Sequence, residues 1–156
     1  MAKYITPTLT ITSNRYDASS NPGPTSTPYN ISVTDLLDVT QVDSKIVTVA
    51  VTPEGTLFDA SDYTASVTAG TDGGYVFLRN LATTAHIYIG HASTGYPTGS
   101  GELHDGANDD GYRIMTLLPG EFAFFPWDMK GDLIYDASAA ADDALEAVLF
   151  VRTGTA

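Results

Sequence analysis

The sequence predicts an all-β protein, an antiparallel β-sandwich of about eight to ten short strands. Three observations lead to this prediction. Apolar and polar residues alternate with a period of two in most segments, which is typical of strands with one buried face. Clusters of Gly, Pro, Asn and Asp separate these segments. No segment sustains the 3.6-residue period of an amphipathic helix.

The N-terminal half opens with a clear strand pattern. Residues 5–12 place Ile5, Leu9 and Ile11 on one face and threonines on the other. Residues 30–42 predict one or two further strands, although the segment "SVTDLL" also fits a single helical turn. The other predicted strands of this half are residues 45–52 and 63–68.

The C-terminal half follows the same pattern with more apolar residues. A short connection, "LATT", separates its first two strands. The segment "DASAAADDALEA" contains helix formers but is short and runs into a strand pattern. The predicted strands are residues 75–80, 85–91, 112–118, 121–127, 132–137 and 145–152.

These elements predict a single domain over residues 1–156, because this length suits one domain and the sequence shows no internal repeat. A chain of this length buries about 70% of its unfolded surface. Residues 1–12 are expected to form an N-terminal arm or strand. Residues 13–30, with their prolines, and residues 92–111, with their glycines and carboxylates, are expected to be long loops.

Composition restricts the chemistry and the compartment. Cysteine is absent, which excludes disulfides, thiolate zinc sites and thiol nucleophiles. No apolar run approaches the roughly 20 residues of a membrane-spanning helix. The N-terminal segment "MAKYITPTLTIT" lacks the apolar core of a signal peptide. We therefore expect the chain to fold in the cytoplasm of the cell that makes it.

The chain is strongly acidic, with 7 Lys and Arg against 19 Asp and Glu and a formal net charge of −12. Such a surface repels phosphate groups, because nucleic-acid binding depends on basic residues that release counterions. Nucleic acid and membranes are therefore not expected partners. The charge either maintains solubility or complements a basic partner surface.

The histidines give only weak signals for a metal site. His86 and His91 are five residues apart, which places them on opposite faces of a strand. His104 lies near Glu102 and Asp105, but this spacing matches no zinc signature. We therefore predict no metal and no other cofactor.

No catalytic motif is present either. Residues 104–111, "HDGANDDG", have the composition of a calcium loop without its ligand spacing or closing Glu. A G-x-S-x-G nucleophile elbow and a phosphate-binding loop are absent from the sequence. A cupin-like metal enzyme is disfavoured, because Ala, Phe and Phe stand where a ligand His would follow the Pro-Gly turn. We predict that the chain is not an enzyme, and the weak calcium alternative involves Asp105, Asn108, Asp109 and Asp110.

The most apolar segment, "RIMTLLPGEFAFFPWDM" at residues 113–129, is apolar on both faces. Pro119 and Gly120 fit a type II turn. Because such a turn splays its flanking strands, we expect a corner at which the chain changes sheets. A sandwich strand normally buries one face only, so the second face of this segment needs a cover.

Two covers are open. One is the chain itself, through the loop at residues 13–30 or the loop at residues 92–111. The other is a neighbouring subunit, because aromatic residues and Met are enriched at the centres of interfaces. For this second alternative the predicted subunit interface consists of Met115, Leu117, Phe125 and Trp127.

Short motifs between residues 74 and 152 resemble a known family. The motifs are Leu78-Arg79-Asn80, Ile87-Tyr88-Ile89-Gly90, Pro119-Gly120-Glu121 and the apolar segment 145–152. In these motifs the chain resembles the capsid cement, or decoration, proteins of tailed bacteriophages. The resemblance implies a jelly-roll-like sandwich without enzymatic activity, which binds the outer surface of a phage head and stabilises it.

The resemblance also implies partners and a location. The expected partners are the major capsid protein and further copies of the chain, with a trimer favoured, on the exterior of the virion. The N-terminal candidates for contact with the shell are Tyr4, Ile5, Arg15 and Tyr16. The alternative is a receptor- or carbohydrate-binding sandwich of a phage tail or fibre, with Tyr96 and His104 in its binding loop.

Overall fold

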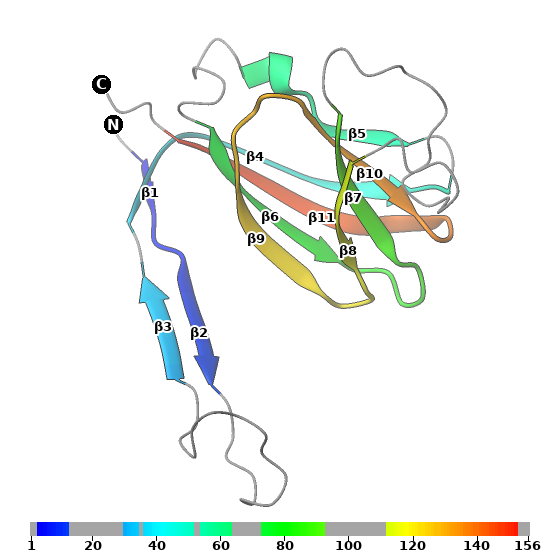
Figure 1. Cartoon of the computed structure of the whole chain (residues 1–156), viewed down its shortest axis with the longest axis horizontal. Helices are drawn as coiled ribbons and strands as arrows, with labels where there is room; N and C mark the ends of the chain where they lie inside the picture. The colour runs from blue at the N-terminus through cyan, green and yellow to red at the C-terminus, as the bar shows by residue number, and fades with distance from the viewer. Residues whose placement is uncertain are drawn as a thin grey trace, which may run out of the picture. The chain divides into compact units, whose positions relative to one another are not determined.

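The computed structural model describes six parts of the chain, coloured in Figure 1. The chain divides into two compact units, Met1–Asp38 and Val39–Ala156, where the sequence predicts one domain with an arm. Of the two predicted loops, residues 13–29 and 93–111 lie outside the described residues. The described residues are 3–12, 30–34, 36–51, 54–63, 73–92 and 112–152.

The N-terminal unit is a small β structure. Its strands are β1 (Lys3–Ile5), β2 (Thr8–Thr12) and β3 (Asn30–Thr34). Strands β2 and β3 pair antiparallel, with Leu9 opposite Val33 and Thr10 opposite Ser32. The predicted strand 5–12 is interrupted at Pro7, which cannot donate a ladder hydrogen bond.

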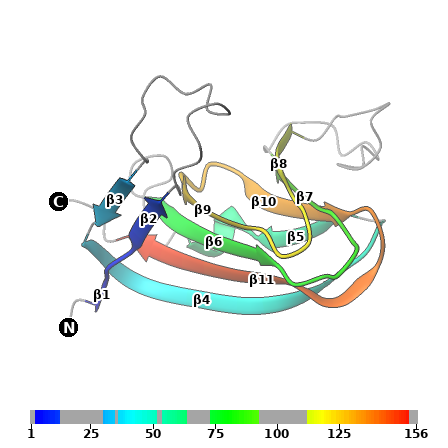
Figure 2. The ribbon, with the colours of Figure 1, turned by 90° about the horizontal axis from the view of Figure 1, so that it is seen from below.

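The second unit is a two-layered sandwich (Figures 1 and 2). Four strands of one sheet follow in the order β4-β11-β6-β9, and the other sheet has the order β5-β10-β7-β8. All pairings between these strands are antiparallel. The strands are β4 (Leu37–Val49), β5 (Gly55–Phe58), β6 (Gly74–Asn80), β7 (Ile87–Ala92), β8 (Tyr112–Leu117), β9 (Phe122–Trp127), β10 (Asp132–Ala137) and β11 (Ala141–Arg152).

This strand order is that of a jelly roll, in which the chain passes between two sheets through two Greek keys. The predicted all-β sandwich is therefore confirmed. The predicted corner is also confirmed, because β8 and β9 belong to different sheets and Pro119 and Gly120 connect them. Gly120 has a φ of +80°, and the Glu121 N–H donates to the Leu118 carbonyl at 2.9 Å, which closes the turn.

Several strand boundaries differ from the predicted ones. Strand β4 is continuous, where the sequence predicts a break after residue 42, and β11 begins at Ala141 instead of residue 145. Strand β5 was not predicted. Tyr63 ends a 3₁₀ helix, η1 (Ala60–Tyr63), instead of beginning a strand, and residues 64–68 lie outside the described part.

The inner faces of the two sheets form the core. From one sheet the fully buried residues include Val76, Leu78, Leu145 and Leu149. From the other they include Ile87, Ile89 and Leu133. These residues alternate with outward-facing neighbours along each strand, as expected for the facing layers of a sandwich.

Two connections between the sheets meet at Asn80, which is fully buried. Its side-chain amide donates to the Ala85 carbonyl at 2.8 Å and to the Leu117 carbonyl at 2.9 Å. Its side-chain oxygen accepts the Ala82 N–H at 2.9 Å. Its backbone N–H donates to the Glu121 carbonyl at 2.9 Å. Asn80 therefore holds the β6–β7 connection and the β8–β9 corner together.

Candidate interaction face on the outer side of the sandwich

The structure decides which face of the apolar segment 113–129 is buried. Trp127 is 5% exposed and Leu117 is 4% exposed, and both lie in the main core cluster. Met115 and Phe125 are half-buried and pack against that cluster. The prediction that these four side chains form a subunit interface is therefore wrong for Trp127 and Leu117, because their own chain already buries them.

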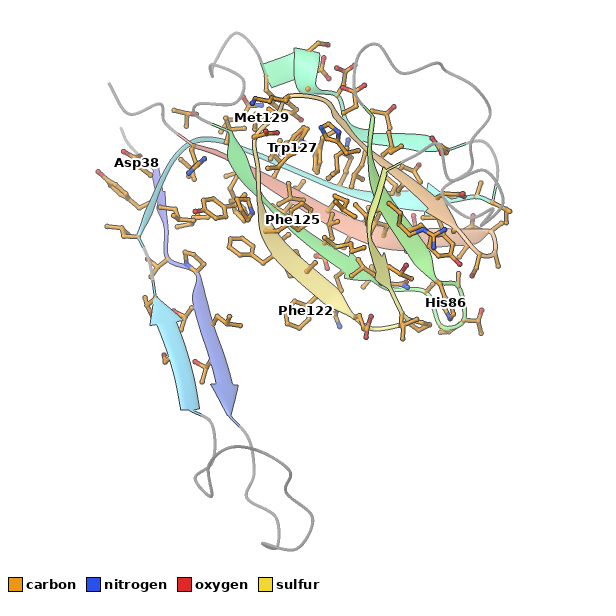
Figure 3. All side chains as sticks on the ribbon, in the orientation of Figure 1. Asp38, His86, Phe122, Phe125, Trp127 and Met129 are labelled. Carbon is orange, nitrogen blue, oxygen red and sulfur yellow. The ribbon has the colours of Figure 1, made fainter. Side chains whose placement is uncertain are left out.

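Trp127 is an aromatic centre of the core (Figure 3). Its ring centroid lies 6.2 Å from that of Phe58 and 6.4 Å from that of Tyr63. The indole N–H donates to the Gly131 carbonyl at 3.2 Å. This polar group therefore has a partner inside the sandwich, as a buried tryptophan requires.

The opposite face of β9 remains in contact with solvent. Phe122 is 64% exposed and Phe124 is 40% exposed. The cross-strand register continues this face onto β6 and β11, where Phe77 stands opposite Phe124, and Tyr75 stands opposite Phe150. We call this surface the outer aromatic face; its residues are Phe122, Phe124, Pro126, Tyr75, Phe77, Arg79, Glu146, Val148, Phe150, Arg152, Val42, Ser44 and Ile46.

The rings of the outer aromatic face are ordered against one another. Tyr75 and Phe124 stack at 5.4 Å with an interplanar angle of 9°. Phe77 and Phe122 stack at 6.3 Å, and Phe124 meets Phe150 edge-on at 6.4 Å. Such pairs stabilise a sheet but leave the outer side of the rings uncovered.

The charge of this face differs from that of the whole chain. Arg79 and Arg152 carry positive charge and Glu146 carries negative charge, so the face has a net charge of +1 while the chain has −12. The Arg152 guanidinium lies 5.3 Å from the centre of the Tyr75 ring. Repulsion between acidic molecules is therefore weaker at this face than the net charge of the chain implies.

The outer surface of the other sheet is less open. Tyr88 and Ile134 form a small buried cluster there. The Arg113 guanidinium lies 4.3 Å from the centre of the Tyr88 ring. Ile114 is 52% exposed and Leu118 is 45% exposed beside the corner to β9. Ile114, Leu118, Phe122 and Phe124 thus place exposed apolar side chains on β8, on β9 and at the corner between them, in addition to Val42 and Ile46 on β4.

A polar cluster lies at the inner end of η1. The Tyr63 hydroxyl donates to Asp43 at 2.7 Å, and the Ala60 N–H donates to Asp132 at 2.9 Å. Burial, followed by the hydrogen bond to Asp43 and the nearby carboxylates, raises the pKa of Tyr63 far above its usual value of 10.0. Asp59 accepts hydrogen bonds from Ser61, which lower the pKa of its carboxyl.

The raised pKa of Tyr63 predicts a pH effect on stability. The unfolded tyrosine ionises near pH 10, whereas the folded residue keeps its proton. Stability from this group is fully present below about pH 10 and is lost as the pH rises above it. Tyr63→Phe should therefore flatten the fall in the free energy of unfolding between about pH 9.5 and 11. Urea titrations across this range test it, and an unchanged slope would contradict it.

The remaining predicted site residues are dispersed. Tyr4, on β1, is 59% exposed, and Ile5 is half-buried. His86 is exposed in the β6–β7 connection, and His91 is half-buried on β7. Arg15, Tyr16, Tyr96, Glu102, His104, Asp105, Asn108, Asp109 and Asp110 lie outside the described residues.

The described residues contain neither a cluster of metal-binding side chains nor a membrane-spanning helix. In the described ranges, His, Cys, Asp and Glu side chains do not form a group of three or more able to hold a metal ion. The same ranges contain no helix of the length and apolar character needed to cross a membrane.

The sequence contains a signal for the existence of the exposed face but not for its position. The two-sided apolar pattern of residues 113–129 indicates that a second face stays uncovered by the core. It does not indicate which side this is.

Compared with known proteins, the chain matches no family model, no curated protein and no solved structure at a significant level.

Proposed function

We propose that the chain is a structural protein without enzymatic activity, which binds the outer surface of a bacteriophage head and stabilises the capsid. The observation that carries the proposal is the outer aromatic face: a sandwich with a filled core keeps Phe122, Phe124 and Ile46 at 64%, 40% and 54% exposure. Large exposed apolar patches are typical of surfaces that bind another protein.

The position of the motifs adds support. Leu78-Arg79-Asn80 ends β6, and Pro119-Gly120-Glu121 forms the corner before β9. Backbone hydrogen bonds join the two motifs, from the Asn80 N–H to the Glu121 carbonyl and from the Gly120 N–H to the Asn80 carbonyl. The residues of the resemblance therefore act together in holding the jelly roll, which is the fold that the resemblance implies.

The proposal assigns partners to surfaces. The outer aromatic face, almost neutral in an acidic chain, contacts the major capsid protein, and Tyr4 and Ile5 are further candidates for this contact. The chain acts as a homo-oligomer on the exterior of the virion, and the resemblance implies three copies. Each bound copy would link neighbouring shell subunits and thereby resist the pressure of the packaged genome.

Binding to phage heads tests the proposal. Purified protein is titrated onto heads that lack it, and bound protein is measured after sedimentation together with the temperature at which the heads release DNA. Wild-type protein should bind saturably and raise that temperature. Ile46→Lys, which charges the outer aromatic face on β4, should weaken binding about tenfold or more.

The matched control is Thr56→Lys, which adds the same charge at an exposed position of β5 in the other sheet. It should bind heads like the wild type. Heads that take up no wild-type protein would overturn the proposal. Equal binding by Ile46→Lys would overturn the assignment of the shell contact to this face.

A further inference from the structure

Strand β9 is the last strand of its sheet, so one of its edges has no neighbour among the described residues. The pairing with β6 runs from Phe122 to Trp127 without a register shift. The Glu121 carbonyl accepts a hydrogen bond from Asn80 of β6. Since alternate residues of an antiparallel ladder point to the same neighbour, the backbone groups of Phe122 and Phe124 point to the open edge.

The position of Pro126 supports this assignment of the backbone groups to the open edge. Pro126 lies at an even-numbered position of β9, like Phe122 and Phe124, and has no N–H to donate. Proline within a sheet is confined to positions where its nitrogen faces away from the ladder. The open edge therefore offers two N–H donors, from Phe122 and Phe124, and ends as a donor edge at Pro126.

Natural proteins protect such edges, and the other sheet of this sandwich does so. Strand β5 is only four residues long and pairs with β10 through an irregular register. Strand β8 carries Arg113, and its pairing with β7 is interrupted by a register shift. Short strands, bulges and charges all hinder pairing with a foreign strand.

Strand β9 lacks these protections over its first four residues. Its sequence, FAFFPW, contains no charged residue, and its pairing with β6 shows no bulge. Phe122 and Phe124 are exposed aromatic residues with high strand propensity. An uncharged, regular and aromatic edge of this kind favours the addition of another strand.

The chemistry of this edge fits a second copy of the same strand. In an antiparallel pair centred on Ala123, Phe122 of each copy stands opposite Phe124 of the other. Each of these residues offers both an N–H and a carbonyl at the edge, so the pair forms four hydrogen bonds. The opposed rings lie on the outer aromatic face, where the net charge of +1 limits repulsion between two chains of −12.

We propose that two copies of the chain associate through their β9 edges, antiparallel and around a two-fold axis, and so join their sheets into one continuous sheet. The inference rests on the proposed function only for self-association itself, and it names the contact and the number of copies. An isologous contact of this kind closes at two copies. It therefore differs from the three copies that the resemblance implies, and a mass measurement distinguishes the two.

Hydrogen exchange of single amides tests the backbone pairing directly. In the monomer, the amides of Ala123 and Phe125 are protected by β6, and those of Phe122 and Phe124 exchange fast. In the pair, the amides of Phe122 and Phe124 should exchange at about one tenth of the monomer rate or below it. The protection should increase with protein concentration. Fast exchange of these two amides at concentrations where the protein is an oligomer would overturn the inference.

Two variants separate the edge from the face. Phe122→Lys places a charge on the edge and should convert the two-copy species to monomer in sedimentation experiments. Ile46→Lys changes a residue of similar exposure in the same cross-strand row, but on β4, and should leave the pair intact. Equal loss of association in both variants would indicate face-to-face contact and overturn edge pairing.

The outcome is independent of head binding. A wild-type protein that pairs in solution but binds no heads would contradict the proposed function and leave the edge contact standing. A protein that stays monomeric up to the millimolar range but still binds heads would contradict the edge contact and leave the proposed function standing. A trimer by mass would overturn the two-fold contact alone.

Discussion

Replacing Trp127 by alanine is expected to lower the free energy of unfolding by about 3–5 kcal/mol. The indole is 5% exposed, contacts the rings of Phe58 and Tyr63, and donates a hydrogen bond to the Gly131 carbonyl. Its removal leaves a cavity between the sheets and one carbonyl without its side-chain donor. Urea unfolding followed by circular dichroism measures the loss.

Phe124→Ala is the matched control, because Phe124 lies on the same strand, is 40% exposed and faces outward. It should cost about 1 kcal/mol or less, chiefly through its lost ring contacts. The loss in Trp127→Ala should not depend on protein concentration, since the side chain is buried within one chain. A stable Trp127→Ala protein that merely changes its oligomeric state would contradict the buried position of the indole.

The strand pattern of the sequence was sufficient to predict the class of the fold. Alternation identified β6, β7, β8, β9 and β10 within a few residues, because each has a regular apolar inner face. It missed the continuity of β4 after residue 42, because the inward positions of this strand include Asp43 and Lys45. These polar residues find partners across the sandwich, in the Tyr63 hydroxyl and the Phe58 ring.

Two further errors have local causes. Strand β5 is four residues long and begins with Gly55, so it gives almost no periodic signal. Strand β11 begins among Ala and Asp residues, which have low strand propensity. Its register with β4 shifts between Ala141 and Leu145, and Asp143 has a φ of +45°. Tertiary pairing therefore extends this strand beyond what propensity predicts.

The sequence was sufficient to predict an exposed apolar face on β9, but not which of its two faces is exposed. Both faces of β9 are apolar, so alternation alone cannot distinguish Phe122 and Phe124 from Phe125 and Trp127. The deciding contacts are long-range: Trp127 meets Phe58 and Tyr63, which lie more than sixty residues earlier in the chain. A single sequence contains no signal for such a contact, and it therefore provided no reason to leave the buried residues Leu117 and Trp127 out of the predicted interface.

The second large effect is expected at Asn80, where Asn80→Ala should lower the free energy of unfolding by about 2–4 kcal/mol. The fully buried amide satisfies the carbonyls of Ala85 and Leu117, and its oxygen accepts the Ala82 N–H. Alanine leaves all three backbone groups without their side-chain partner in a site with little room for water. Urea unfolding at pH 7 measures the effect.

Ser138→Ala is the control, because the Ser138 hydroxyl accepts the His86 N–H at 2.9 Å in the same region but at an exposed site. Water can replace that bond, so the cost should be below about 1 kcal/mol. Equal costs for the two variants would contradict a special role of Asn80 in joining the two connections.

Asn80→Asp separates the hydrogen bonds from the volume of the side chain. The introduced carboxylate would face the carbonyl oxygens of Ala85 and Leu117, so burial and these acceptors should raise its pKa above the unfolded value of about 3.9. The proton is then held more tightly in the folded protein, and stability should fall as the pH rises from about 4 to 7. Relative to wild type, the variant should therefore be less destabilised at pH 4 than at pH 7. A difference from wild type that does not change with pH would contradict the placement of this side chain in a buried site against the two carbonyl oxygens.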